Sequence, residues 1–469
     1  MQEYIAELSK YFITILFAVY ALECFLVFRF QEERIRKGIY LRQRLYIFLI
    51  QFLAFYTMAV KSGEMDYLFF YAFVQVFLFA AIALTGMIYE KINRLLLNNM
   101  CMLLGISFIV LSRLLGAKLS VSGNPDGFLK VSVSKPVMQL FIVIVSLLVC
   151  LAVPTLMNRM RFLKKLTWVY AAVGIVMLAA VLILGNLTHG SKISFSVGGI
   201  TFQPSEFVKL IFVFFLAAAL AERADFLRIV LTTVIAAAHV IILVLSRDLG
   251  SALIFFAAYV FIVFMATGSY LYLSVGITAF GVSAVSAYYL FDHVRVRVLA
   301  WKDPFSYIDK QGYQITQSLF AIGSGNWFGL GLFGGTPGDI PYVETDFIFS
   351  AICEELGVIS AICILLICLS SFIMMLQIGM QCRDGFYRLI ALGFGVVYIF
   401  QIFLTVGGGI KFIPMTGVTF PFISYGGSSI LTTMLLFFVI QALYLNRPKE
   451  GGSRHVPKAR TEIERQGKA

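Results

Sequence analysis

Long apolar segments recur along nearly the whole chain, and short polar segments separate them. An α-helix needs about 18 or more such residues to cross roughly 30 Å of hydrocarbon. Thirteen segments meet this condition and are predicted to be membrane-spanning helices, at residues 8–28, 45–61, 67–88, 98–115, 136–156, 166–187, 204–221, 227–246, 249–267, 271–291, 346–377, 386–409 and 424–446. The pattern therefore predicts an all-α polytopic membrane protein.

Basic residues between the apolar segments predict which loops face the cytoplasm, because such loops carry an excess of lysine and arginine. The loop after the first segment holds Arg29, Arg34, Arg36, Lys37, Arg42 and Arg44. Alternation from that loop leaves 157–165, 222–228, 381–388 and the C-terminal tail inside, each with at least two cations. The N-terminus and the long loop 292–345 are then predicted to lie outside.

Composition agrees with this picture and removes two other readings. The chain has 469 residues, of which 60% are hydrophobic and 13% charged, and a mean hydropathy of +0.90, which excludes a soluble globule. The net charge of +12 is explained by cytoplasmic loops, so nucleic acid is not an expected partner. The seven cysteines occur singly and are predicted to be packing residues. The first apolar segment lacks a basic n-region and a cleavage site, so we interpret it as an uncleaved anchor.

The interval 301–357 is the candidate place for chemistry, because it mixes charged residues and many glycines that no bilayer core could hold. Asp346 follows Thr345, a candidate N-cap, at the start of an apolar span. The alternative is that this carboxylate only stabilises the N-terminus of a helix. Glu354 and Glu355 are candidate buried carboxylates whose role the spacing leaves open.

Charged residues inside apolar spans need a partner or a water-filled cavity, since each is disfavoured by about 2.5–3.5 kcal/mol near mid-membrane. In the segment FQPSEFVKL, Pro204 suits the first turn of a helix, and Glu206 and Lys209 stand three residues apart on one face. They are predicted to pair. The spacing does not distinguish a functional pair from an ion pair that only fixes helix packing.

Several other polar residues have both a functional and a structural reading. Arg247 could hold a pyrophosphate with two donors, or lie in a solvated turn with Asp248. Arg295 and Arg297 could do the same, or belong to a surface charge run. His239 is predicted to be a satisfied core histidine. The segment PFISYGGSS offers hydroxyls and backbone N–H groups at the start of a span.

Five ordered segments resemble the RodA/FtsW/SpoVE family, the SEDS proteins: FQPSEFVKL, SRDLGSALI, the DP and GYQITQSLFAIGSG block, TDFIFSAICEELG and IPMTGVTFPFISYGGSS. The resemblance covers about residues 98–446. It implies a SEDS core of ten helices at 98–446. The first three predicted helices, at 1–97, lie outside the resemblance and form an accessory region. The basic residues 447–469, charged and broken by proline and glycine, are predicted to be a disordered cytoplasmic tail.

The resemblance implies a peptidoglycan glycosyltransferase that polymerises lipid II on the outer face of the bacterial cytoplasmic membrane, surrounded by membrane lipid and assisted by a class B penicillin-binding protein. Asp346 takes the position of the family's essential aspartate and is the expected general base. The expected substrate-binding residues are Glu206, Lys209, Arg247, Gln203, Ser205, Gln314, Gln317, Ser424, Gly426 and Gly427. A divalent cation, magnesium or manganese, is a further expectation, shared by Asp346 and Glu206, and no organic cofactor is expected.

Two positions depart from the family pattern, in which members often carry histidine at Glu344 and tryptophan near Ser194. The second departure puts the positioning of the acceptor in question. The rival readings are a lipid II flippase and a non-catalytic scaffold of the cell-wall synthesis complex. Transporters usually carry internal repeats, and no fixed-period repeat is found here. The sequence leaves open whether the protein serves elongation, division or sporulation, and what the first three spans do.

Overall fold

The computed structural model describes residues 2–116, 119–123, 129–159, 161–188, 191–197, 200–222 and 224–447. The predicted disordered tail lies outside these residues apart from Arg447. The elements in chain order are α1 (Gln2–Arg29), α2 (Glu33–Ser62), α3 (Asp66–Ile88), α4 (Arg94–Leu115), β1 (Leu119–Gly123), β2 (Leu129–Val133), α5 (Lys135–Leu151), α6 (Val153–Arg159), η1 (Arg161–Lys165), α7 (Thr167–Leu184), β3 (Asn186–Thr188), β4 (Ser191–Val197), β5 (Ile200–Phe202), α8 (Pro204–Leu220), α9 (Phe226–Leu245), α10 (Leu249–Thr267), α11 (Tyr270–Leu290), α12 (Asp292–Lys302), α13 (Tyr313–Gly325), η2 (Pro337–Asp339), α14 (Ile348–Gln381), α15 (Gly385–Gly409) and α16 (Gly427–Leu445).

Each predicted span coincides with a helix of this bundle. Twelve helices in the described part of the chain are long and apolar enough to cross a membrane. α8 has 17 residues, one fewer than the 18 that define this group. Helices satisfy their own backbone hydrogen bonds, which is what a hydrocarbon solvent requires. The predicted all-α polytopic class is confirmed, and all seven cysteines are free and buried as predicted.

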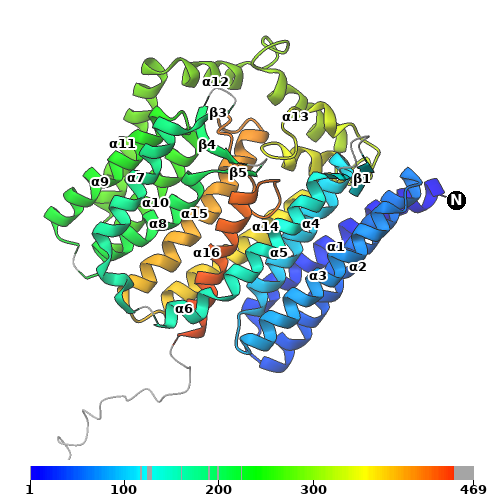
Figure 1. The fold of residues 1–469 in the computed structure, drawn as a ribbon, viewed down its shortest axis with the longest axis horizontal. Helices are drawn as coiled ribbons and strands as arrows, with labels where there is room; N and C mark the ends of the chain where they lie inside the picture. The colour runs from blue at the N-terminus through cyan, green and yellow to red at the C-terminus, as the bar shows by residue number, and fades with distance from the viewer. Residues whose placement is uncertain are drawn as a thin grey trace, which may run out of the picture.

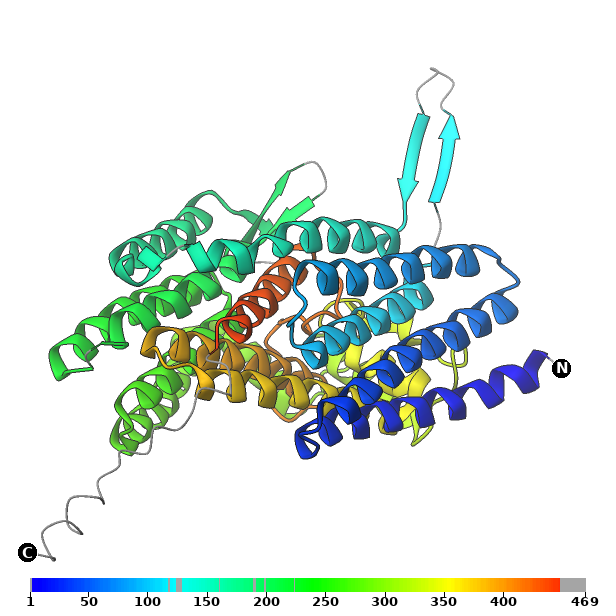
Figure 2. The same cartoon turned by 90° about the horizontal axis from the view of Figure 1, so that it is seen from below.

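The elements between the spans separate to the two ends of the bundle. α12, α13 and the strands lie at one end, which we call the site end, and α6 and the start of the tail lie at the other, the basic end (Figure 1). The antiparallel β1–β2 hairpin projects away from the helices (Figure 2). At the basic end, Lys164 pairs with Asp384. Which end faces the cytoplasm stays a prediction.

The segment 292–345 is more ordered than the single long loop predicted from sequence, because it contains α12, α13 and η2. The Trp301 indole N–H donates to Lys411 O at 3.1 Å, which ties α12 to the end of α15. Ser318 Oγ on α13 donates to Gly409 O at 2.7 Å. These contacts hold the segment down against the helix ends, as expected for a polar chain that folds back onto the bundle.

α14 bends at Gly357, whose φ of 86° is not helical. The bend frees backbone groups on either side, and the segment after α13 satisfies them. Val358 N donates to Asn326 O at 3.0 Å, and Leu330 N donates to Glu354 O at 2.9 Å. The span predicted as one continuous helix therefore has a short first arm at the site end and a long second arm through the bundle.

α1, α2 and α3 pack as a layer beside α4, α5 and α14 (Figures 1 and 2). Asn99 of α4 accepts from the Tyr20 hydroxyl at 3.1 Å and donates to Ser370 Oγ at 2.9 Å. The apolar part of α4 is 100% buried inside the protein. α4 begins at Arg94, so the boundary predicted between residues 97 and 98 falls inside this helix.

Candidate functional site

The predicted Glu206–Lys209 pair forms in the first turns of α8, where Pro204 occupies the start of the helix. Lys209 Nζ donates to Glu206 Oε2 at 2.5 Å and to Gln401 Oε1 at 2.8 Å. The Thr432 hydroxyl donates to the same Glu206 oxygen at 3.0 Å. Both charged side chains are buried, with 7% and 4% of their surface exposed. Each charge thus has the partners that burial requires.

Gln401 joins this pair to the segment after α15. Its side-chain amide donates to Thr419 O at 3.0 Å, and one turn further along α15 the Thr405 hydroxyl donates to Val418 O at 2.9 Å. Sequence reasoning missed Gln401. The signal was present, because an amide in the middle of an apolar span needs a polar partner.

Asp346 lies in a turn before α14. The helix begins at Ile348, and no side chain caps it. The Thr345 hydroxyl instead donates to Tyr342 O at 3.1 Å, and Asp346 N donates to the same oxygen at 3.1 Å. The predicted Thr345 cap is therefore wrong. Thr-Asp before an apolar run looks like a cap, but here it belongs to the preceding turn.

A small cavity of about 10 Å³ borders Asp346, which is room for about one water molecule. Its walls come from the turn before α14, the end of α15 and the segment 415–418. Glu206 and Lys209 are not among the lining residues. Thr405 lines the cavity and Gln401 binds Lys209, and four residues of helix separate them by about 6 Å along the axis. The two parts of the predicted pocket are therefore linked through α15.

Ser424 and Tyr425 fasten the start of the last span to the residues just before Asp346. The Ser424 hydroxyl donates to Thr345 O, and Tyr425 N donates to Glu344 O at 2.8 Å. Lys135 Nζ pairs with Glu344 Oε1 at 2.7 Å. Partial burial raises the pKa of Glu344. The hydrogen bond and charge of Lys135, together with a backbone hydrogen bond, lower the pKa by more than burial raises it, so the pKa of Glu344 is below its usual value.

Gln203 and Ser205 converge on Asp248. The Ser205 hydroxyl donates to Asp248 Oδ2 at 2.9 Å, and the Gln203 amide approaches the same oxygen at 3.4 Å. Gln203 N also donates to Ser428 Oγ at 3.0 Å. Asp248 Oδ1 accepts from Ser251 N at 3.1 Å and so caps α10. Sequence analysis treated Asp248 only as part of a turn, and its role depends on contacts with a distant helix.

Arg297 is the cation that the structure brings to Asp346. Its guanidinium donates to Met415 O and Thr416 O, each at 3.3 Å, on a wall of the Asp346 cavity. Burial lowers the pKa of Arg297, while the charges of Asp346 and Asp248 raise it. The functional reading of Arg297 therefore fits the structure better than a surface charge run.

Arg247 extends this positive region, and His293 feels the charges of both Arg247 and Arg297. Burial lowers the pKa of His293, and the charges of Arg297 and Arg247 lower it further. Arg247 is exposed and has a φ of 63° at the turn between α9 and α10. Arg295 pairs with exposed Asp292 at 3.4 Å, which is the surface reading for that residue.

The remaining predicted substrate residues fall in two groups. Gly426 N donates to Gln139 Oε1 at 3.4 Å, and Gly427 starts α16, so both belong to the Ser424 segment. Gln314 and Gln317 are half-buried on α13, and neither has a side-chain hydrogen bond to another described residue. Their role in binding stays a prediction.

Glu354 and Glu355 hold the segment that follows α13. Arg113 Nε donates to Glu355 Oε1 at 2.7 Å, and a second guanidinium nitrogen donates to Gly335 O at 3.0 Å. Thr336 N donates to Glu354 Oε1 at 2.9 Å. The structure thus gives both carboxylates a positional role, which spacing had left open.

Two other residues named from the sequence lie apart from this site. His239 is fully buried, with Nδ1 at 2.8 Å from Ile235 O, but its Nε2 has no partner in the described part of the protein. The prediction that both ring nitrogens of His239 have hydrogen-bond partners therefore holds for Nδ1 only. Ser194 is buried in β4, with 7% of its surface exposed.

The side chains fit the expected cation in part only. The described residues contain no group of three or more histidine, cysteine, aspartate or glutamate side chains that could hold a metal ion. Glu206 Oε2 is already occupied by Lys209 and Thr432, so Glu206 does not fit as a ligand. Of the two predicted ligands of the cation, Asp346 is the one that remains.

Comparison with known proteins gives a consistent result. The family described as "Cell cycle protein", FtsW/RodA/SpoVE, matches residues 93–448. A protein named peptidoglycan glycosyltransferase RodA from Mycobacterium leprae is 32% identical over 362 residues, 74% of this chain and 76% of that protein. The protein of the same name from Mycobacterium tuberculosis is 36% identical over 307 residues, 61% of this chain. The match spans 66% of the M. tuberculosis protein's length.

A solved structure also shares the fold. Its title is "Structural coordination of polymerization and crosslinking by a peptidoglycan synthase complex". The similarity has a TM-score of 0.60 and 26% sequence identity, and it covers 75% of this chain and 97% of that one. The three N-terminal helices precede the segment matched by the family.

Proposed function

The chain belongs to the FtsW/RodA/SpoVE family, and from this premise we propose that it is a peptidoglycan glycosyltransferase that polymerises lipid II. The single observation that carries the proposal is the site end itself. There Asp346 stands beside a small cavity, and the half-buried guanidinium of Arg297 binds the carbonyl oxygens of Met415 and Thr416, two residues that line this cavity. A carboxylate next to fixed cations is what glycosyl transfer from a lipid pyrophosphate needs.

In the proposed reaction, Asp346 accepts the proton of the acceptor's 4-hydroxyl while that oxygen attacks the anomeric carbon of the donor sugar. The new glycosidic bond forms with inversion as the bond from the anomeric carbon to the pyrophosphate oxygen breaks. The electron pair leaves with the pyrophosphate. Arg297 and Arg247 stabilise its charge, because a guanidinium offers paired donors to phosphate oxygens.

Glu206 and Lys209 act as positioning residues in this proposal. Lys209 is buried and already neutralised by Glu206, so its charge is not free to meet the pyrophosphate. The pair instead fixes Gln401, and Gln401 holds the segment that forms a wall of the Asp346 cavity. Loss of the pair would move that wall.

The outer face of the bacterial cytoplasmic membrane is the proposed place of reaction. The basic end carries the loops that the positive-inside rule assigns to the cytoplasm, and α12, whose Arg297 feels the charge of Asp346, lies at the opposite end. A class B penicillin-binding protein is the proposed partner. Support comes from the similar chain in a structure whose title names polymerization and crosslinking by a synthase complex.

A divalent cation belongs to the proposal in a limited form. Asp346 together with substrate phosphates would hold it, as is usual for magnesium sites with few protein carboxylates. Such an ion would neutralise phosphate charge. The measurement is polymer formation after chelation and after re-addition of magnesium or manganese, and unchanged activity in excess chelator would remove the cation from the proposal.

The deciding experiment uses full-length protein, purified with its penicillin-binding partner and supplied with lipid II. We expect polymer from the wild type and a loss of at least about 100-fold in Asp346→Asn, because general-base catalysis contributes roughly 10²–10⁴-fold. Asp339→Asn is the matched control, since Asp339 is an exposed carboxylate of the same segment. A wild-type polymer yield from Asp346→Asn would show that Asp346 is not the general base.

The same preparation separates the rival classes. A flippase would translocate fluorescent lipid II in liposomes without forming polymer, and a scaffold would do neither. Either result for the wild type would replace the proposed activity.

A further inference from the structure

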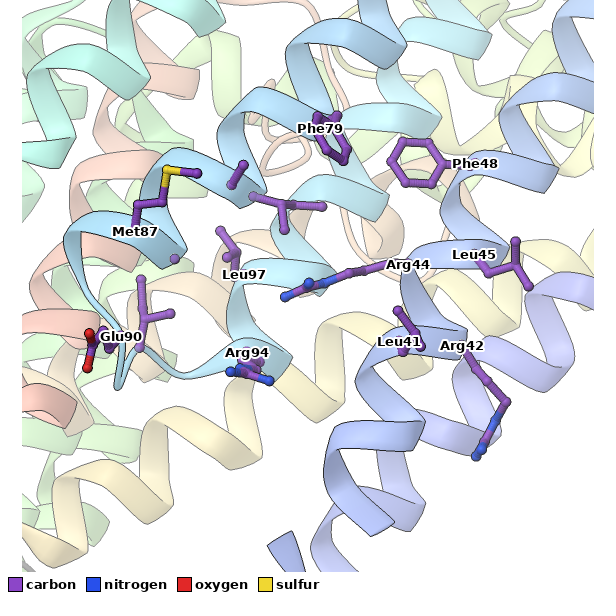
Figure 3. A pocket seen from close by; sticks show the side chains of 14 residues that line it. Leu41, Arg42, Arg44, Leu45, Phe48, Phe79, Met87, Glu90, Arg94 and Leu97 are labelled. Carbon is purple, nitrogen blue, oxygen red and sulfur yellow. The ribbon is translucent and has the colours of Figure 1, made fainter. Parts of the chain in front are cut away.

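A cavity of about 710 Å³ lies between α2, α3 and α4 near the basic end of the bundle (Figure 3). Asp346 belongs to the opposite end, so this cavity is separate from the site described above. Its volume lies within the range of roughly 300–1,000 Å³ that ligand sites occupy. One wall comes from α2 and α3 of the N-terminal unit α1–α3, and the other comes from α4 of the family core.

Two arginines from opposite walls meet at the polar end of the cavity. Arg44 extends from α2 into the space between the helices, and Arg94 stands below it at the start of α4 (Figure 3). Both are half-buried. The hydrogen-bond acceptor recorded for Arg44 is neutral, Asn98 Oδ1 at 3.4 Å from Arg44 Nε. A half-buried cation with a neutral hydrogen-bond partner and a second cation nearby favours an anionic ligand.

The carboxylates nearby leave these two charges largely uncompensated. None of the ion pairs among the described residues includes Arg44 or Arg94. The neighbouring Arg42 pairs with Glu23 at 2.5 Å, and the exposed Glu33, whose carboxylate feels the charge of Arg94, pairs with Lys37 at 2.8 Å. Glu90 is the carboxylate in the cavity lining, and Figure 3 shows it at the far side, turned away from Arg44. The cavity lining therefore carries an excess of positive charge.

The rest of the cavity is apolar. Phe48 and Phe79 both line the cavity beyond the arginines, toward the middle of their helices (Figure 3). Phe79 is 67% exposed and Leu45 is 53% exposed, while Leu97 forms a buried floor. A cavity with cations at the polar end of a span and aromatic side chains deeper along the helices has the profile of a lipid: a charged headgroup followed by an acyl chain.

We propose that this cavity binds one anionic glycerophospholipid. Its phosphate sits between Arg44 and Arg94, and an acyl chain runs along Leu45, Phe48 and Phe79. Basic pockets between transmembrane helices at the cytoplasmic side are known to take anionic headgroups. A zwitterionic lipid would bring its own cation beside two arginines and is disfavoured. The lipid then joins the N-terminal unit to the core, because each wall supplies one of its two cations.

The test measures lipid binding by the full-length protein in detergent, by native mass spectrometry with phosphatidylglycerol or phosphatidylcholine of the same chains. The wild type is expected to prefer phosphatidylglycerol. Arg44→Gln combined with Arg94→Gln is expected to weaken that binding by roughly 10- to 30-fold, because a basic residue near a membrane surface contributes about 1 kcal/mol. The matched control, Arg34→Gln with Lys91→Gln, removes two exposed charges that do not line the cavity.

A second variant tests the apolar part without touching the arginines. A side chain at Gly86 of α3, which lines the cavity, would meet nothing within 4 Å of its Cβ, so Gly86→Phe is compatible with the fold. We expect it to reduce phosphatidylglycerol binding as well. The proposal is overturned if the wild type binds both lipids equally, if the double arginine variant keeps the preference of the control, or if Gly86→Phe binds like the wild type.

Discussion

The buried Glu206–Lys209 pair makes a prediction about single and double substitutions. Lys209→Met leaves an unpaired carboxylate among buried groups, and breaking a buried pair in this way costs about 3–5 kcal/mol. Glu206→Gln combined with Lys209→Met removes both charges and should restore most of the stability. Thermal unfolding of the purified protein in detergent measures the difference.

A positioning role for the pair requires that polymer formation stay low in the double variant although its stability returns. Lys37→Met is the control, because the exposed Lys37–Glu33 pair should contribute less than about 1 kcal/mol. A double variant as unstable as Lys209→Met would contradict the ion-pair argument. A double variant with full activity would show that Gln401 is held without Lys209.

His293 predicts a pH effect at the site end. Burial and the neighbouring arginines lower its pKa below the ordinary 6.5, so the folded protein favours the neutral ring. This contribution to stability is fully present above pH 6.5 and is lost as the pH falls through the lowered pKa, since the unfolded chain takes up the proton first. His293→Gln should therefore flatten the fall in melting temperature between pH 7 and pH 5. An unchanged slope would show that other groups cause it.

At the scale of residues, the sequence predicted pairs that lie close along one helix and missed those that depend on tertiary contacts. Glu206 and Lys209 were found because three residues of helix bring them onto one face. Arg297 meets Met415 and Thr416 across more than a hundred residues of chain, which no local spacing reveals.

The bend in α14 predicts a strong effect of Gly357→Ala. The φ of 86° disfavours any side chain by roughly 1–2 kcal/mol, and a Cβ would lie 2.5 Å from Trp327 O. Gly323→Ala is the matched control, because Gly323 lies within α13, where a Cβ meets nothing within 4 Å and alanine favours the helix. The melting temperature and the polymer yield should fall for Gly357→Ala and stay at the wild-type values for Gly323→Ala. Equal behaviour of the two variants would contradict the role of the bend.

At the scale of elements, hydropathy located every span but could not show how the spans end. A glycine in an apolar run hardly changes the hydropathy, so the bend at Gly357 was invisible and α14 was predicted as one helix. α12 and α13 were also missed, because polar helices that lie across a bundle end lack the long apolar window on which the prediction depended.

For the whole molecule, the separation of basic and polar loops to two ends follows from charge alone, and it was predicted. The packing of α1–α3 against the core was not predicted, because the outer faces of these helices carry no distinguishing pattern. Their contacts with the core are polar as well as apolar: the Thr14 and Ser360 hydroxyls lie 3.1 Å apart, and Lys61 Nζ donates to Leu332 O at 2.7 Å.

These contacts predict the result of removing residues 1–92, which ends just before α4. Lipid can replace apolar packing, because its tails are as apolar as leucine, but it cannot replace the partners of Asn99 and Ser360. Each lost interhelical hydrogen bond costs about 1 kcal/mol, and several are lost together. We expect a truncated chain that is markedly less stable and forms little polymer. Co-expression of residues 1–92 as a separate chain should restore both stability and polymer formation. Lys61→Met in the intact protein should lower the polymer yield and leave the melting temperature nearly unchanged, since it releases only the segment near Glu355. A truncated chain with wild-type stability and activity would show that the three helices are dispensable for the core.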